Sequence, residues 1–218
     1  MTTEKIYLHK FLLIMLITDL PYFGTIDFVK SISNQNDVYF DNERPFTKMS
    51  FKNRMVIATA QGALPLTIPV IGGRYQKSPI KDVKIAYDSP WHLQHLKALT
   101  SSYQRAPYFE YYQEDLNLIY SAKQVFLIDF LMEGHCWLRK QLKGNWNILE
   151  SKPSELILEQ RSLTQQDMFS LPKNYHLLPN PILYQQVFED RVGFLPNLSI
   201  LDLLFNCGGK QAKHLLSL

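Results

Sequence analysis

Two histidines, His92 and His95, lie three positions apart in the segment that follows Trp91. In a helix this spacing puts both imidazoles on one side, where they could share a metal ion. A zinc site also needs a third protein ligand, and neither a third ligand nor a general base is evident nearby. We therefore expect no metal ion. His95 acts either as a general acid/base or substrate donor, or has a surface or helix-packing role.

Asn53 and Arg54 follow Phe51 and open a predicted strand. The planar guanidinium of an arginine at a strand start can hold both oxygens of a carboxylate or a phosphate. The alternative is a salt bridge between Arg54 and an acidic neighbour, Asp41 or Glu43. The sequence leaves both interpretations of Arg54 open.

Polar side chains also occur in the apolar C-terminal segment. Tyr184 and Gln185 offer a phenol and an amide to a ligand, and Asn197 can cap the final helix. Asp202 lies within the apolar face of that helix, and a buried carboxylate must be hydrogen-bonded or paired. Asp202 either bonds a loop backbone or a tyrosine in a structural role, or it orients a residue of a pocket.

The elements that must position these residues begin with a strand-helix-strand unit. The apolar run at 11–18 predicts a buried strand, 24–32 a short helix, and 37–41 a second strand. Three such elements within about thirty residues suggest a parallel pair of strands with a right-handed crossover.

A hairpin is predicted next. Strands at 55–59 and 64–70 flank a turn at 60–63 that contains a glycine, and 83–86 predicts another short strand. The fold class is therefore α/β, in which the strand-helix-strand unit and the hairpin form a mixed sheet.

The C-terminal half is predicted to be mostly helical. Asp88 or Ser89 can cap a helix that has Pro90 at its first position and ends near Tyr103. The amphipathic pattern at 113–141 predicts one long helix or two shorter ones.

A last helix is predicted at 195–205, ended by Gly208 and Gly209. Its apolar residues Leu201, Leu204 and Phe205 are expected in the core. Because there are no repeats and no linker long enough to divide the chain, residues 1–218 are expected to form a single domain.

Composition excludes several classes of protein. The chain has 218 residues, 46% hydrophobic and 20% charged, which is typical of a globular protein rather than a disordered one. The net charge of +3 is too small to indicate a nucleic-acid partner. Cys136 and Cys207 lie far apart without metal-type spacing, so two free thiols in a reducing compartment are expected.

The apolar run from Phe11 to Ile17 superficially resembles a signal peptide. However, Asp19 and Pro21 follow it without a small-residue cleavage site, and it is shorter than the roughly 20 residues that cross a bilayer. We therefore predict no membrane span and a cytoplasmic protein. Standard phosphate-loop, dinucleotide, Gly-x-Ser-x-Gly and Cys-x-x-Cys motifs are missing from the sequence, and no cofactor is expected.

Several motifs, in order along the chain, closely resemble those of the WbqC-like family. They are Pro21-Tyr22-Phe23-Gly24, Asn53-Arg54, Leu66-Thr67-Ile68-Pro69-Val70, Trp91 with His95, Tyr103, Pro107, Phe109-Glu-Tyr-Tyr112, Tyr184-Gln185-Gln186-x-Phe188 and the stretch from Phe194 to Gly208. The resemblance spans about residues 11–215. The family tends to place a second aromatic residue after the helix histidine, whereas Leu96 follows His95 here.

The resemblance implies a role in bacterial surface-polysaccharide or O-antigen biosynthesis. We expect a group-transfer enzyme, which transfers an acyl or aminoacyl group to an amino sugar; the alternative is a non-catalytic sugar-nucleotide binder or accessory subunit. Arg54 would hold a phosphate or carboxylate of the donor, and His95 would remove a proton from the acceptor.

The remaining site residues expected beside Arg54 and His95 are Tyr22, Asn53, Tyr184, Gln185, Asn197 and Asp202, at strand ends and helix starts. Arg54 and His95 are predicted to share one pocket with Tyr184 and Gln185. The expected partner is a small molecule or activated sugar, with charged tRNA left open and the oligomeric state not predicted.

Overall fold

A computed structural model describes residues 15–150, 174–177 and 179–218. Strands β1 (Met15–Thr18) and β2 (Asp37–Phe40) pair in parallel, and helix α2 (Ile26–Ser33) connects them. The short strand β5 (Asn147–Ile148) pairs in parallel with β2. The predicted strand-helix-strand unit is therefore confirmed, while residues 11–14 of the predicted first strand lie outside the described residues.

The predicted hairpin is formed by β3 (Arg54–Thr59) and β4 (Gly62–Thr67), joined by a turn at Ala60 and Gln61. The α/β class is confirmed, but the hairpin makes a two-stranded sheet of its own instead of joining the parallel strands. The edge of β3 that faces away from β4 bonds the C-terminal segment instead of a parallel strand. The backbone N–H of Ser199 donates to the Val56 carbonyl, so the C-terminal segment takes the place of a further strand.

The region between the hairpin and the helices contains two short 3₁₀ helices, η1 (Gly73–Tyr75) and η2 (Ile80–Asp82). The strand predicted at 83–86 is not formed. Instead, Ile85 makes an isolated bridge to Val70, and Lys84 makes one to Phe126. Because each neighbour pairs with only one residue of the segment, no continuous strand results.

Three helices follow: α3 (Trp91–Tyr103), α4 (Phe109–Ser121) and α5 (Leu127–Gln141). The sequence left open one long helix or two shorter ones at 113–141, and the structure has two, α4 and α5. The predicted cap of α3 by Asp88 or Ser89 is wrong. Pro90 occupies the cap position, and no side chain bonds the first turn.

The C-terminal segment contains the single-turn helix α8 (Glu189–Val192) and the long helix α9 (Ile200–Leu216). Ser199 caps α9 by accepting from the backbone N–H of Leu201, so the predicted start at residue 195 is wrong. The predicted end at Gly208 is also wrong. Gly208 adopts φ 72° and kinks the helix, which then resumes and runs to Leu216.

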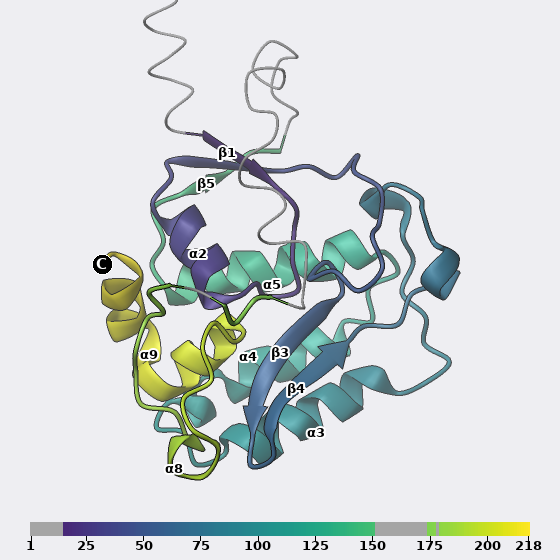
Figure 1. The fold of residues 1–218 in the computed structure, drawn as a ribbon. Coiled ribbons are helices and arrows are strands. Elements are labelled where there is room, and N and C mark those ends of the chain that lie inside the picture. The colour runs from purple at the N-terminus through teal and green to yellow at the C-terminus, as the bar shows by residue number, and fades with distance from the viewer. Residues whose placement is uncertain (1–14, 151–173, 178) are drawn as a thin grey trace, which may run out of the picture.

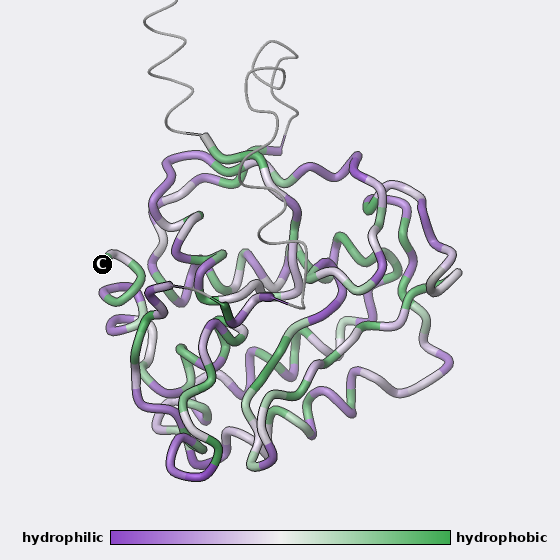
Figure 2. The backbone as a smooth tube through the Cα atoms, in the orientation of Figure 1, coloured by the Kyte–Doolittle hydropathy of each residue, from purple (hydrophilic) through white to green (hydrophobic). Residues whose placement is uncertain are grey.

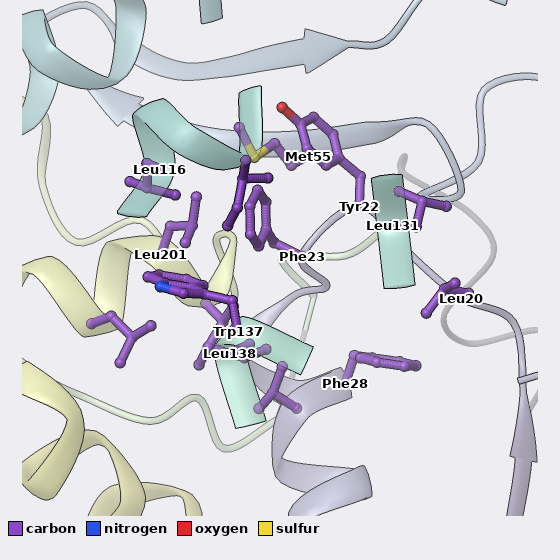
Figure 3. Packing of buried hydrophobic residues seen from close by; sticks show 14 of the residues in the cluster. Leu20, Tyr22, Phe23, Phe28, Met55, Leu116, Leu131, Trp137, Leu138 and Leu201 are labelled. Atoms are coloured by element: carbon purple, nitrogen blue, oxygen red, sulfur yellow. The ribbon is translucent and has the colours of Figure 1, made fainter. Parts of the chain in front are cut away.

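The core lies where these elements meet. Helix α5 crosses the middle of the molecule, with the parallel sheet on one side and α4 and α9 on the other (Figure 1). Figure 2 shows the apolar residues along the inner strands, whereas the α8 turn is hydrophilic. Phe23, Trp137 and Leu201 pack together in Figure 3. The predicted core residues Leu201, Leu204 and Phe205 are fully buried, which confirms that part of the prediction.

Cys136 and Cys207 are both free thiols, the first exposed and the second buried. Among the residues that the structure describes, no helix is both long enough and apolar enough to cross a membrane.

Candidate functional site

A cavity of about 830 Å³ opens beside the segment that precedes α9. Its walls come from the loop between α3 and α4, the extended stretch around Tyr184, α8, Phe194 and Asn206 of α9. The lining residues are Arg105, Pro107, Leu183, Tyr184, Gln185, Gln186, Val187, Glu189, Asp190, Phe194 and Asn206. We call it the Tyr184 cavity. Most of its polar lining belongs to the C-terminal segment that the sequence analysis singled out.

A buried carboxylate holds two of the residues that line the Tyr184 cavity. Asp202, on the first turn of α9, is fully buried. The Tyr184 hydroxyl donates to its Oδ1 at 2.7 Å, and the Tyr103 hydroxyl donates to its Oδ2 at 2.6 Å. Asn206 Nδ2 donates to Oδ1 at 3.1 Å. Asp202 therefore bonds two tyrosines and also orients Tyr184 and Asn206, which line the cavity, so both roles left open by the sequence are present.

Burial sets the protonation of this network. Removal from water raises the pKa of Asp202 to about 6, although its three hydrogen-bond donors favour the carboxylate and lower it. Burial, together with the nearby carboxylate, raises the pKa of Tyr184 and of Tyr103 well above 10. The two phenols therefore remain hydrogen-bond donors at neutral pH, while Asp202 changes charge close to it.

Gln186 fixes the backbone of the lining segment. Its Nε2 donates to the Leu195 carbonyl at 2.9 Å and to the Tyr184 hydroxyl at 3.0 Å, and its Oε1 accepts from the Leu195 N–H at 2.9 Å. The adjacent Gln185 is exposed at the cavity wall. The sequence analysis placed Gln185 in the site and missed the supporting role of Gln186, although the paired glutamines after Tyr184 were visible.

Three charged residues of the cavity wall, Arg105, Glu189 and Asp190, were not singled out from the sequence. Arg105 and Asp190 are exposed and form no ion pair with any part of the chain that the structure describes. Glu189 Oε2 accepts from the backbone N–H of Gln186 at 3.2 Å. No sequence signal distinguishes such residues from ordinary surface charges; only the cavity beside them does.

His95 and Tyr22 lie in the core, apart from this cavity. The Tyr22 hydroxyl is 2.9 Å from His95 Nδ1 and also bonds the Tyr120 hydroxyl, and the His95 ring packs against Trp91. Burial lowers the pKa of His95 to about 4, opposed by a hydrogen bond with the Thr67 backbone. His95 is therefore neutral at physiological pH and hydrogen-bonded within the core. Figure 3 shows Tyr22 among the core side chains.

Asn53 and Arg54 hold the hairpin. Buried Asn53 donates through Nδ2 to the Ile68 carbonyl at 2.7 Å, and Arg54 Nε donates to Thr67 Oγ1 at 3.3 Å across the strand pair. The salt bridge from Arg54 to Asp41 or Glu43, one of the two alternatives left open by the sequence, is not formed, because those carboxylates pair with Arg44 and Lys81. Neither Arg54 nor His95 lines the Tyr184 cavity, so the predicted grouping of both with Tyr184 and Gln185 is not found.

Asn197 caps a helix, but a different one from that predicted. Its Oδ1 accepts from the backbone N–H of Asp27 in the first turn of α2 at 2.9 Å, and its Nδ2 donates to the Tyr175 carbonyl at 2.7 Å. Asn197 adopts φ 53°, a conformation that asparagine tolerates better than most residues. It therefore links the C-terminal segment to the N-terminal unit and does not line the cavity.

Within residues 15–150, 174–177 and 179–218, no group of three His, Cys, Asp or Glu side chains could hold a metal ion. Burial raises the pKa of the Cys207 thiol to about 11, so the thiolate is disfavoured.

The fold and site thus define an α/β protein with a polar, charged cavity beside its C-terminal helix. The WbqC-like protein family model matches residues 20–174, and the chain belongs to this family. The match ends before Tyr184, so the C-terminal motif and most of the cavity lie beyond it.

A similar protein is the uncharacterised protein Rv1507c of Mycobacterium tuberculosis. It is 25% identical over 223 residues, which cover 90% of this chain and 93% of the relative. No solved structure matches the chain.

Proposed function

We propose that this WbqC-like protein is a cytoplasmic group-transfer enzyme of bacterial surface-polysaccharide biosynthesis. In this proposal the Tyr184 cavity binds an activated amino sugar, and the amine of that sugar receives an acyl or aminoacyl group. The observation that carries the proposal is the composition of the cavity wall, where two carboxylates stand beside a row of amide and phenol groups.

The charge of the wall suits an amino sugar. Glu189 and Asp190 against Arg105 leave a net charge of −1, which favours the ammonium form of an amine. The exposed amide of Gln185 and the half-buried amide of Asn206 can bond sugar hydroxyls, which need both donors and acceptors. Phe194 supplies an apolar surface for the face of a sugar ring.

The same carboxylates can assist the transfer. The bound ammonium first gives one proton to a wall carboxylate, Asp190 or Glu189, which releases it to solvent. The neutral amine nitrogen then attacks the carbonyl carbon of the donor, the amide C–N bond forms, and the bond from that carbon to the leaving sulfur or oxygen atom breaks. The second proton lost by the nitrogen passes through the same carboxylate to the leaving group. Asp202 takes no part in this transfer because Tyr184 and Asn206 cover it; its role is to position them.

The proposal is tested by calorimetric titration with a nucleoside-diphosphate amino sugar and with its N-acetylated counterpart. The free amine should bind about ten-fold more tightly or better, because only the ammonium pairs with the carboxylates. Asp190→Asn should remove that preference. Glu114→Gln, on the exposed face of α4 and outside the cavity, is the matched control and should keep it. Equal affinity of wild type for the two sugars would contradict the proposal.

A non-catalytic sugar-nucleotide binder is the second candidate. It is favoured by one observation: of the described residues that line the cavity, none is a histidine, cysteine or serine, so no residue there can form an acyl-enzyme through these groups. Mass spectrometry of the sugar after incubation with acyl thioesters, or with aminoacyl-tRNA, separates the two. A product heavier by the acyl group supports the transferase. Tight binding of the sugar without product from either donor class supports the binder.

A further inference from the structure

A second cavity, of about 440 Å³, lies next to the Tyr184 cavity. Arg105, Val187 and Asp190 line both, so the two share a wall. The remaining lining residues of the second cavity are Ala60, Ser101, Ser102, Gln104, Phe188 and Arg191. The hairpin turn, the last turn of α3 and helix α8 therefore enclose a smaller chamber that opens beside the larger one.

The two cavities differ in charge. The second has two guanidinium groups, Arg105 and Arg191, against the single carboxylate of Asp190, for a net charge of +1. The Tyr184 cavity has a net charge of −1 from Glu189, Asp190 and Arg105. Neither arginine is in an ion pair with any residue whose placement the structure describes. Both guanidinium groups are thus available to an outside anion.

Other groups at the second cavity bear on anion binding. The hydroxyls of Ser101 and Ser102 and the amide of Gln104 can donate hydrogen bonds to phosphate oxygens. The carboxyl end of α3 opposes an anion with about half a negative charge. Two full positive charges outweigh this partial charge together with the carboxylate of Asp190.

We propose that the second cavity is a diphosphate subsite, in which Arg105 and Arg191 hold the phosphates of a ligand that extends into the Tyr184 cavity. A planar guanidinium matches two phosphate oxygens, and a pair of them matches the two adjacent phosphates of a diphosphate. In such a ligand the diphosphate at one end would lie in the second cavity, of charge +1, and the ammonium at the other end would lie in the Tyr184 cavity, of charge −1. The amino-sugar half rests on the proposed function; the diphosphate half does not.

The test uses inorganic pyrophosphate as the probe, measured by calorimetric titration at low and at high salt. Wild type should bind it, more weakly as salt rises. Arg191→Ala, which alters the second cavity alone, should weaken binding about ten-fold, and Arg105→Ala should do the same. Lys140→Ala, at an exposed position of α5 outside both cavities, is the control for loss of a surface cation and should bind like wild type.

Asp190→Asn separates the subsite from the proposed function. It should weaken binding of the amino sugar, yet leave pyrophosphate binding equal or tighter, because it removes a negative charge from the second cavity. If only Arg105→Ala and Arg191→Ala lose pyrophosphate binding, the subsite is supported, even where wild type shows no preference for the amino sugar. Pyrophosphate binding that is absent, or equally weakened by Lys140→Ala, overturns it, even where the amino sugar binds.

A diphosphate could belong to a nucleotide sugar or to a coenzyme A thioester. Displacement of pyrophosphate by a nucleoside diphosphate assigns the subsite to the sugar nucleotide, and displacement by coenzyme A assigns it to the acyl donor. Either result supports a diphosphate subsite. Failure of both to compete overturns it.

Discussion

The carboxyl group of Asp202 holds its proton to a higher pH in the folded protein than in the unfolded chain. Burial raises its pKa from 3.8 to about 6. Between these two values the folded state is protonated and the unfolded state is not. The contribution of this group to stability is therefore fully present below about pH 4 and is lost as the pH rises through 6.

Asp202→Asn should remove this dependence, because asparagine does not titrate. The free energy of unfolding of wild type minus that of the variant should be about 2 kcal/mol larger at pH 4 than at pH 7. Urea denaturation at both pH values measures it. His95 and His135, whose pKa values burial lowers to about 4, titrate in both proteins and cancel in the difference. A difference that does not change with pH would contradict the assignment.

For single residues, the sequence shows that a buried polar side chain must be hydrogen-bonded more readily than it shows which residue bonds it. An aspartate within the apolar run of α9 had to be satisfied, and Tyr184 was available nearby. Tyr103, which is 99 residues away, could be identified only from the fold. The same holds for His95, whose hydrogen-bond partner Tyr22 lies 73 residues away and could be identified only from the fold.

Among the helices, α9 depends on two adjacent glycines with different tasks. Gly208 supplies the positive φ of the kink. Gly209 is helical and lies against the end of α5, where an added Cβ would be 2.3 Å from the Gln141 carbonyl oxygen. The kink explains Gly208 and the close approach of two backbones explains Gly209; neither glycine ends the helix.

Gly209→Ala should destabilise the protein by about 1–3 kcal/mol, since the new methyl group overlaps a backbone atom that cannot rotate away. The sign is informative, because alanine in an unobstructed helix would gain about 1 kcal/mol over glycine. Lys210→Ala, at the next and exposed position of α9, is the control and should change stability by less than about 0.5 kcal/mol. A Gly209→Ala protein as stable as wild type would mean that α5 and α9 lie further apart.

Helix and strand types were predictable because apolar spacing directly reflects local burial, as in α2, β2 and the hairpin. The end of α9 was not, because a glycine pair looks the same whether it stops a helix or admits a neighbour. Asn197 was recognised as a cap, but the helix that it caps, α2, is 170 residues away in sequence.

Across the whole molecule, the stretch from Asn197 to Ile200 joins the two sheets. Ile26 N–H donates to the Leu198 carbonyl, and Ile200 N–H donates to the Gly24 carbonyl, which ties the stretch to the strand-helix-strand unit. Ser199 N–H donates to the Val56 carbonyl of the hairpin. That residues 1–218 form one domain stays a prediction, and because of this junction we expect the strand-helix-strand unit and the hairpin to unfold together.

Leu204→Ala tests that prediction, because Leu204 is fully buried on α9 next to this junction. The variant should lose about 2–5 kcal/mol of unfolding free energy. Tryptophan fluorescence, which reports on the three buried tryptophans Trp91, Trp137 and Trp146, and far-ultraviolet circular dichroism should shift to the same lower midpoint. Two separate transitions, with only one of them shifted, would divide the chain into independent units.

The fold class was predictable at this scale because alternating strands and helices restrict the possible layers. The division into two sheets was not, since nothing in the apolar pattern of β3 reveals that its neighbour is an irregular stretch near residue 199. The cavity formed beside that stretch was likewise hidden, because its charged wall resembles ordinary surface.

The bond between Asp27 and Asn197 spans 170 residues. Thr25 caps α2 locally by accepting from the Phe28 N–H. During synthesis at about 5–20 residues per second, the Asp27 N–H in the same turn waits roughly 10 to 30 s for Asn197 to be made. The parallel strands and the hairpin emerge from the ribosome early and incomplete, with their apolar faces exposed. Chaperones that shield such faces should consequently engage this chain throughout most of its translation and release it only once α9 has appeared.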